Sequence, residues 1–204
     1  MKQVSQPPLQ HIAIICDGNR RWARSRGLEV FAGHKRAVEE VFEVLINRAM
    51  KIGLPYLTFW IFSTENWDRD KKEIDFLMQL FRSIFDKQLK NWNEAGVRLR
   101  VIGDPTALAP DIQERIARGL VETENNTKLN LTLAINYGGR DELTRAVKKM
   151  AAAVEKKELS STDITQKTIA SYLDTAGLPD PDVIVRTSGE NRMSGFMPWQ
   201  QQYS

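Results

Sequence analysis

The sequence predicts an α/β protein with a central parallel sheet that carries helices on both faces. Short apolar segments rich in Ile, Val, Leu and aromatic residues alternate with longer amphipathic segments along the 204-residue chain. The apolar segments do not alternate strictly with polar residues, which is typical of strands buried on both faces. Alternating strands and helices favour βαβ units, and these build parallel sheets. The length suits one domain, which we expect to span residues 1–204.

The elements follow one another in a regular order. The predicted strands are His11–Cys16, Tyr56–Phe62, Val97–Ile102, Asn130–Ile135 and Val183–Arg186. Glycine and proline mark most ends of the segments between them, and these segments are predicted as the helices Gly33–Ile52, Lys71–Ala95, Asp111–Glu124, Arg140–Glu158 and Thr165–Thr175. The second helix has a wider apolar stripe than a half-buried helix needs. It is either buried deeply in one core or lines part of an apolar tunnel.

Composition and charge exclude several classes of protein. The net charge of +3 is too small to indicate nucleic-acid binding, and we expect no nucleic-acid partner. Cys16 is the only cysteine, so an internal disulfide is excluded, and we expect a small buried side chain. No segment approaches the ~20 apolar residues of a membrane span, and residues 1–8 lack the apolar region of a signal peptide. We therefore expect a cytoplasmic protein, which a lipidic substrate would bring to a membrane surface.

Unusual polar side chains gather in the loops that follow the predicted strands. Ligands of open parallel sheets bind beyond the carboxyl ends of the strands. Four of the five loops there are rich in arginine, glycine, asparagine or hydroxyl side chains, namely 17–22, 63–69, 136–140 and 186–194. Arginine binds phosphate oxygens in pairs, and hydroxyl and backbone N–H groups supply further hydrogen bonds. Asp17 is a carboxylate among these cations and would hold Mg²⁺ bridged to the phosphates. The pattern predicts a diphosphate site.

Each loop also has an ordinary structural explanation. Residues 17–19 would form a turn and a helix cap. Glu65 and Arg69 would form a surface pair four residues apart, and His34 would merely open its helix. The functional interpretation depends on the coincidence of these loops at one edge of the sheet.

The loops also carry specific motifs. In chain order these are HIAIICDGNRRWA at 11–23, GHK at 33–35, FSTENWDR at 62–69, NYGGR at 136–140 and RTSGENRMS at 186–194. Together they resemble the signature motifs of the cis-prenyltransferases, whose best-known member is undecaprenyl diphosphate synthase. The resemblance runs in order from His11 to Ser204. Motifs in this order are far more specific than a single glycine-rich motif.

The resemblance implies a fold and a reaction. The fold would be that of undecaprenyl diphosphate synthase, with an apolar tunnel between sheet and helices, in a homodimer. The reaction would elongate an allylic diphosphate, such as farnesyl diphosphate, with isopentenyl diphosphate to give a cis-polyprenyl diphosphate that associates with membranes. The cofactor would be Mg²⁺. Trans-type prenyl synthases use paired Asp-rich motifs, and we find none in this sequence.

The resemblance also implies roles for individual residues. Asp17 would bind Mg²⁺ and assist departure of the allylic diphosphate. Asn66 corresponds to the residue usually assigned as proton acceptor, but an amide is a weak base, so we expect it to position the proton or the diphosphate that takes it. The substrates would be bound by Gly18, Asn19, Arg20, Arg21, Trp22, His34, Ser63, Thr64, Glu65, Trp67, Arg69, Arg186, Arg192, Met193 and Ser194.

The sequence departs from the family pattern in two places. Relatives continue beyond the position of Ser204 with a Glu that helps to bind Mg²⁺ and with a further strand, so we expect the C-terminal end of the domain to be missing. Trp60 and Ile61 stand where relatives often carry smaller residues, and their bulk would shorten the tunnel.

Two other functions are compatible with parts of the sequence. A non-catalytic scaffold subunit would not need the intact Asp17, Asn66 and Arg192. A general phosphate-binding α/β protein would leave the long apolar helix unexplained.

Overall fold

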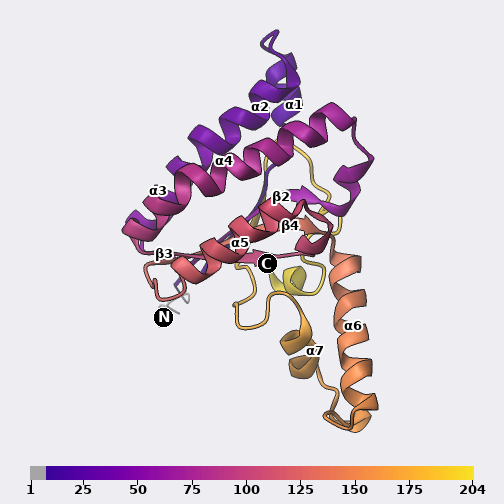
Figure 1. Ribbon diagram of the computed structural model, residues 1–204. Helices are drawn as coiled ribbons and strands as arrows, with labels where there is room; N and C mark the ends of the chain where they lie inside the picture. The colour runs from indigo at the N-terminus through magenta and orange to yellow at the C-terminus, as the bar shows by residue number, and fades with distance from the viewer. Residues whose placement is uncertain (1–7) are drawn as a thin grey trace, which may run out of the picture.

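The computed structural model describes residues 8–204 and confirms the parallel α/β architecture (Figure 1). Five strands form one sheet in the order β3-β4-β2-β1-β5. They are β1 (His11–Ile15), β2 (Tyr56–Ser63), β3 (Val97–Ile102), β4 (Leu129–Tyr137) and β5 (Val183–Arg186). Every ladder between neighbouring strands is parallel. Of the N-terminal stretch that we interpreted as lacking a signal peptide, residues 1–7 lie outside the described part.

Helices cover both faces of the sheet (Figure 1). They are α1 (Asn19–Arg24), α2 (Val30–Arg36), α3 (Phe42–Lys51), α4 (Lys71–Ala95), α5 (Pro110–Glu122), α6 (Gly139–Glu155) and α7 (Gln166–Tyr172). The larger apolar cluster joins one face of the sheet to α3, α4 and α5, and a smaller cluster on the other face contains Ile15, Tyr137 and Phe196. Neighbouring residues of a strand point to opposite faces. The carboxyl ends of the strands therefore separate two apolar environments.

Local signals explain the boundaries that were predicted correctly. Asp70 caps α4 by accepting a hydrogen bond from the Lys72 N–H (2.8 Å), and Gly96 ends the helix with a positive φ of 81°. The predicted bounds of α4, β3 and β5 are confirmed. The other predicted elements are confirmed with ends shifted by a few residues.

The first two helices differ from the prediction. The expected helix Gly33–Ile52 begins earlier, at Val30, and a π-helical turn, Ala37–Val41, interrupts it. Helix α1 was not predicted, because its six residues are mostly polar and show no apolar period. A Cβ atom at Gly33 would lie 2.0 Å from the Asn19 carbonyl oxygen, so only glycine lets α2 pack this closely on α1. His34 therefore lies inside a helix that touches the first loop.

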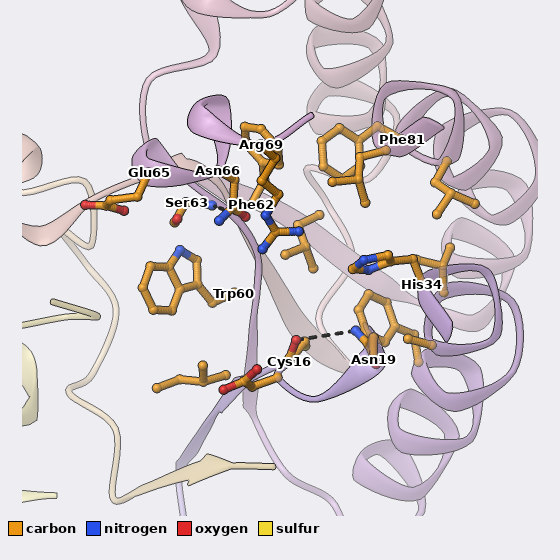
Figure 2. Close-up of a pocket in the computed structure, with 18 of the residues that line it drawn as sticks. Cys16, Asn19, His34, Trp60, Phe62, Ser63, Glu65, Asn66, Arg69 and Phe81 are labelled. Carbon is orange, nitrogen blue, oxygen red and sulfur yellow. Dashed lines mark hydrogen bonds between the residues drawn. The ribbon is translucent and has the colours of Figure 1, made fainter. Parts of the chain in front are cut away.

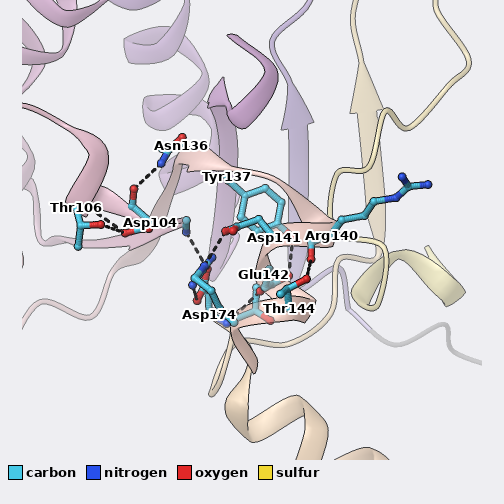
Figure 3. A network of polar contacts seen from close by, with 12 residues as sticks. Asp104, Thr106, Asn136, Tyr137, Arg140, Asp141, Glu142, Thr144 and Asp174 are labelled. Carbon is cyan, nitrogen blue, oxygen red and sulfur yellow. Dashed lines mark hydrogen bonds and ion pairs between the residues drawn. The ribbon is translucent and has the colours of Figure 1, made fainter. Parts of the chain in front are cut away.

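A buried polar network supports the second face of the sheet (Figure 3). The Tyr137 hydroxyl donates to Glu142 Oε2 (2.6 Å), and Glu142 Oε1 accepts from the Asp174 N–H (3.0 Å). Arg145 donates two hydrogen bonds of 2.6 Å to the Asp174 carboxylate. Burial raises the pKa of Glu142, and the Tyr137 hydroxyl opposes that shift. This network ties α6 to the segment after α7.

None of the helices within residues 8–204 has the length and apolarity to span a membrane.

Candidate active site

A cavity of about 410 Å³ opens where β1, β2 and β5 end (Figure 2). Its polar rim consists of Asp17, Asn19, His34, Ser63, Glu65, Asn66, Arg69, Arg186 and Ser194. Its apolar wall includes Ala37, Val38, Phe42, Ile61, Phe62, Leu77, Leu80 and Phe81. The last three belong to α4 and are also buried in the core, so the expected deep burial of this helix is confirmed, and part of its apolar stripe also lines the cavity. A polar rim beside an apolar wall suits an amphiphilic ligand.

Asp17 and Arg186 form an ion pair on this rim. Asp17 Oδ2 accepts hydrogen bonds from Nη2 (2.7 Å) and Nε (3.1 Å) of Arg186, and Oδ1 accepts from the Gly18 N–H (2.6 Å). Partial burial pushes the pKa of Asp17 upward, but the hydrogen bonds from Arg186 and Gly18 outweigh it and leave the pKa below its ordinary value. Asp17 is therefore an anion at neutral pH.

The loop after β5 is organised around the same arginine. The Arg186 side chain is 11% exposed, and its Nη1 donates to Ser194 Oγ (2.8 Å) and to the Arg192 carbonyl oxygen. Arg192 is 72% exposed and faces a wide opening of about 750 Å³. This opening is also lined by Asp17, Gly18, Asn19, Arg20, Arg21, Arg24, His34 and Arg69. Seven of the fifteen predicted substrate ligands thus line this opening, the basic mouth, and four more lie on the rim of the adjoining cavity.

Glu73 lies close to three of these cationic or polar side chains, and the sequence alone did not indicate that it belongs to the site. It lies in the first turn of α4, and its side chain is 7% exposed. Its carboxylate oxygens lie 2.8 Å from Arg69 Nη1, 3.4 Å from His34 Nε2 and 3.8 Å from Arg20 Nε. Arg69 therefore pairs with Glu73, and not with Glu65. The available signal was a carboxylate next to the apolar stripe, four residues after Arg69.

Burial decides the charge of two further groups at the site. Burial lowers the pKa of His34, Arg69 acts in the same direction, and Glu73 opposes them. His34 is thus neutral at pH 7. Burial also raises the pKa of the Cys16 thiol to about 12, which removes this cysteine as a nucleophile at neutral pH.

The loop after β2 is folded as a 3₁₀ turn, Thr64–Asp68. The Ser63 N–H donates to Asn66 Oδ1 (3.2 Å). Trp67 Nε1 donates to Asn136 Oδ1 (2.8 Å), and Asn136 Nδ2 donates to the Asp104 carbonyl oxygen (2.7 Å). Asn136 has a positive φ of 48° at the end of β4, a conformation that asparagine tolerates better than most residues. It connects two of the loops at the site.

Four predicted ligands, Trp22, Thr64, Trp67 and Met193, line neither the cavity nor the wide opening. Thr64 is next to Gly138, where a Cβ atom would lie 2.4 Å from Thr64 Oγ1. Met193 packs against the smaller apolar cluster, and Trp67 contacts Asn136 as described. Trp22 lines a neighbouring pocket of about 500 Å³, and its ring has the guanidinium carbons of Arg26 and Arg36 at 4.5 and 4.6 Å.

Asp17 fits a metal ion only in partnership with a substrate. No three His, Cys, Asp or Glu residues within 8–204 are grouped to hold a metal ion. Mg²⁺ in phosphate-handling enzymes is usually bound through one or two carboxylates, with substrate oxygens and water completing the octahedron. The Asp17 carboxylate is 35% exposed at the basic mouth, so its chemistry and its place suit this arrangement.

The fold and site together define a class of protein. A parallel sheet carries clustered arginines and the accessible carboxylate of Asp17 at its strand ends, beside an apolar cavity. These features define a class of proteins that bind an amphiphilic ligand carrying phosphate groups.

Comparisons with known proteins identify the family. Residues 15–204 match the family model described as putative undecaprenyl diphosphate synthase. The isoprenyl transferase of Agrobacterium fabrum is 46% identical over 96% of this chain and 78% of its own length, and that of Clostridium tetani is 44% identical over 96% and 76%. The chain belongs to the undecaprenyl diphosphate synthase family, the cis-prenyltransferases, and is an enzyme that transfers prenyl groups.

Solved structures agree with this assignment. Lavandulyl diphosphate synthase from Lavandula x intermedia, in complex with dimethylallyl diphosphate, is 35% identical with a TM-score of 0.91, covering 94% of this chain and 83% of that one. A probable undecaprenyl diphosphate synthase from Campylobacter jejuni is 32% identical with a TM-score of 0.76, covering 98% and 84%.

Proposed function

We propose that the protein condenses isopentenyl diphosphate with an allylic diphosphate, such as farnesyl diphosphate, in a reaction that requires Mg²⁺ and creates a cis double bond. A carbon–carbon bond would form between the two substrates, the allylic carbon–oxygen bond would break, and a proton would leave the isopentenyl unit. The observation that carries the proposal is the accessible Asp17 carboxylate, which lies among arginines at the mouth of an apolar cavity.

The residues of the basic mouth would bind the two diphosphates. Residues 18–21 would hold the allylic diphosphate, with His34 and Arg69 beside it. Arg186, Arg192 and Ser194 would hold isopentenyl diphosphate. The arginines would stabilise the negative charge that develops on the leaving diphosphate. Bound Mg²⁺ would supply further charge neutralisation there, and Asp17 would be its protein ligand.

The loop 63–69 would complete the site above the substrates. Ser63, Glu65 and Asn66 line the cavity there. The Oδ1 atom of Asn66 already accepts the Ser63 N–H, so Asn66 would position the departing proton rather than act as a strong base.

The hydrocarbon of the allylic substrate would extend along the apolar wall. Each buried CH₂ group would contribute about 0.8 kcal/mol. Leu77 and Phe81 on α4 line this cavity together with Ala37 and Val38, and the proposal places the start of a tunnel there. A cytoplasmic homodimer that delivers its product to a membrane is also part of the proposal, on the strength of the family alone.

Labelled isopentenyl diphosphate tests the proposal directly. The protein is incubated with farnesyl diphosphate and the label, with and without Mg²⁺, and products are separated by length. We expect incorporation only with Mg²⁺ and its loss in Asp17→Ala. Asp75→Ala is the matched control, because Asp75 is exposed on α4 and, among residues 8–204, pairs only with Lys71. Folded wild-type protein that incorporates no label would contradict the proposal.

A further inference from the structure

One row of residues crosses three neighbouring strands at the site. Ile15 of β1 is paired with Arg186 of β5 on one side and with Trp60 of β2 on the other. Paired residues of parallel strands point to the same face of the sheet. Ile15 belongs to the smaller apolar cluster, and Trp60 packs against it. The row therefore runs along this face from a guanidinium group, over an aliphatic side chain, to an indole ring.

The indole ring of Trp60 is held in place. One face stacks on Phe196 with ring centroids 4.9 Å apart and an angle of 12° between the planes. Its Nε1 donates to the Tyr137 carbonyl oxygen (3.2 Å), and the Tyr137 ring stands nearly perpendicular to it, at 87°. Phe196 and Tyr137 are both 0% exposed. With the rest of its surface Trp60 lines the cavity beside Ser63 and Glu65 (Figure 2), so it is a rigid part of the cavity wall.

The side chain of Ile61, the next residue, packs on the opposite face of the sheet. The pairing of β2 with β4 shifts register between Trp60 and Phe62. This irregularity, a β-bulge, lets Ile61 and Phe62 both pack against the larger cluster. Trp60 is consequently the last apolar residue of β2 on its own face, while Ile61 belongs to the wall formed with Leu77 and Phe81. The strand thus separates two apolar surfaces at the same site.

The length of the row matches a short hydrocarbon. Neighbouring strands lie about 4.8 Å apart, so Trp60 stands roughly 10 Å from the backbone of Arg186. A diphosphate bound by Arg186 and Ser194 leaves space over Ile15 for about one isoprene unit before the indole is reached.

We infer that Trp60 is the end wall of the subsite for the acceptor substrate and restricts that substrate to a single five-carbon unit. The inference rests on the proposed function, because that function assigns isopentenyl diphosphate to Arg186 and Ser194. Ile15 forms the floor of the subsite, and the stacking of Phe196 on Trp60 holds the indole ring in position. The donor hydrocarbon lies on the Ile61 side, so one strand distinguishes the two substrates.

Comparing the affinities of two ligands distinguishes the contribution of the apolar contact to binding from the contribution of the diphosphate contact. The affinities of isopentenyl diphosphate and inorganic diphosphate are measured by titration calorimetry for wild type, Trp60→Phe and Trp60→Ala. We expect wild type to prefer isopentenyl diphosphate. Trp60→Ala should reduce that preference about tenfold, as expected for loss of one hydrophobic contact, with unchanged affinity for inorganic diphosphate. Trp60→Phe should keep most of the preference.

Trp60→Ala should also accept a ten-carbon homoallylic diphosphate that wild type rejects.

The matched control is Trp92→Ala, since Trp92 is 6% exposed in the core near the far end of α4. It should lower thermal stability without changing the ratio of the two affinities. An unchanged ratio in folded Trp60→Ala and Trp60→Phe would overturn the role of Trp60. Wild type that binds neither diphosphate would instead overturn the proposed function. Should Trp60→Ala not fold, an unchanged ratio in Trp60→Leu decides against the inference in the same way.

Discussion

Two carboxylates organise the positive charge of the site at the residue scale. Asp17 fixes Arg186 through two hydrogen bonds, and Glu73 fixes Arg69 while lying close to His34. Charge-assisted hydrogen bonds of this kind restrict long side chains to one geometry. Arg192, by contrast, is mostly exposed. The site therefore combines pre-positioned arginines with one that remains available at the mouth of the opening.

Ile61 should limit the length of the product. It lines the cavity beside Leu77 and Phe81, where the growing hydrocarbon would lie. Ile61→Ala removes bulk from this wall, and we expect longer products in the chain-length assay. The substitution should also cost about 2 kcal/mol of unfolding free energy, as for other truncated core side chains.

Ile74→Ala is the control for this prediction. Ile74 packs against the same apolar cluster from α4, but it lies outside the cavity lining. It should lower stability to a similar extent and leave product length unchanged. An identical product distribution for wild type and Ile61→Ala would end the idea that this position narrows the tunnel.

At the scale of elements, predictability followed the strength of local signals. Helix α4 has a capping aspartate, a long apolar stripe and a terminal glycine, so both of its ends were predicted. Helix α1 has six residues, no capping hydrogen bond from a side chain and no stripe, so it was missed. The π-helical turn 37–41 was missed too, because an apolar period alone does not distinguish it from a regular helix.

The candidate site, too, could be predicted only as far as local sequence motifs indicate it. Motifs after the strands indicated which loops meet, because the carboxyl ends of parallel strands share one edge. They did not indicate Glu73, whose partners come from α1, α2 and the loop after β2. They did not indicate that Ile61 and Phe62 share one face either, because the β-bulge that places both side chains against the larger cluster depends on the pairing with β4.

The hydrogen bond between Trp67 and Asn136 should couple the loop after β2 to the end of β4. Trp67→Phe removes the donor, and Asn136→Gly removes the acceptor while tolerating the positive φ. In urea unfolding, we expect the two substitutions to be non-additive by about 1 kcal/mol, the usual contribution of one hydrogen bond.

A distant pair provides the comparison for this cycle. Asn126 donates to Asn93 Oδ1 (2.8 Å) and to the Val97 carbonyl oxygen (2.9 Å) near the start of β3. Trp67→Phe combined with Asn126→Ala should therefore be additive within about 0.5 kcal/mol. Additive effects for Trp67→Phe and Asn136→Gly would show that the two loops are independent.

At the scale of the whole molecule, packing on the two faces of the sheet stabilises the fold, and the carboxyl edge of the sheet carries the candidate site. Helices α3, α4 and α5 cover one face with the larger cluster, and the network around Glu142 stabilises the other. The carboxyl edge of the strands is left for the site.

Acid should destabilise the fold through its two histidines. His11 is 1% exposed; its Nδ1 donates to the Pro179 carbonyl oxygen (2.8 Å), so its Nε2 accepts from Thr58 Oγ1 (2.7 Å). Burial lowers the pKa of His11 from 6.5, against the Pro179 hydrogen bond and the charge of Asp182. The pKa of His34 is lowered as well. Below pH 6.5, the two histidines therefore bind protons more readily in the unfolded chain than in the folded protein.

Stability should accordingly fall as the pH drops below 6.5, toward the lowered folded-state pKa values. The slope should be about 1.4 kcal/mol per pH unit for each proton taken up on unfolding. Glu142 acts in the opposite sense, because its raised pKa lets the folded protein bind a proton first, so Glu142→Gln should steepen the fall. Urea unfolding between pH 7.5 and 5.5 measures the slope, and His11→Gln and His34→Gln should each flatten it. A slope that neither histidine substitution alters would show that other groups govern the acid response.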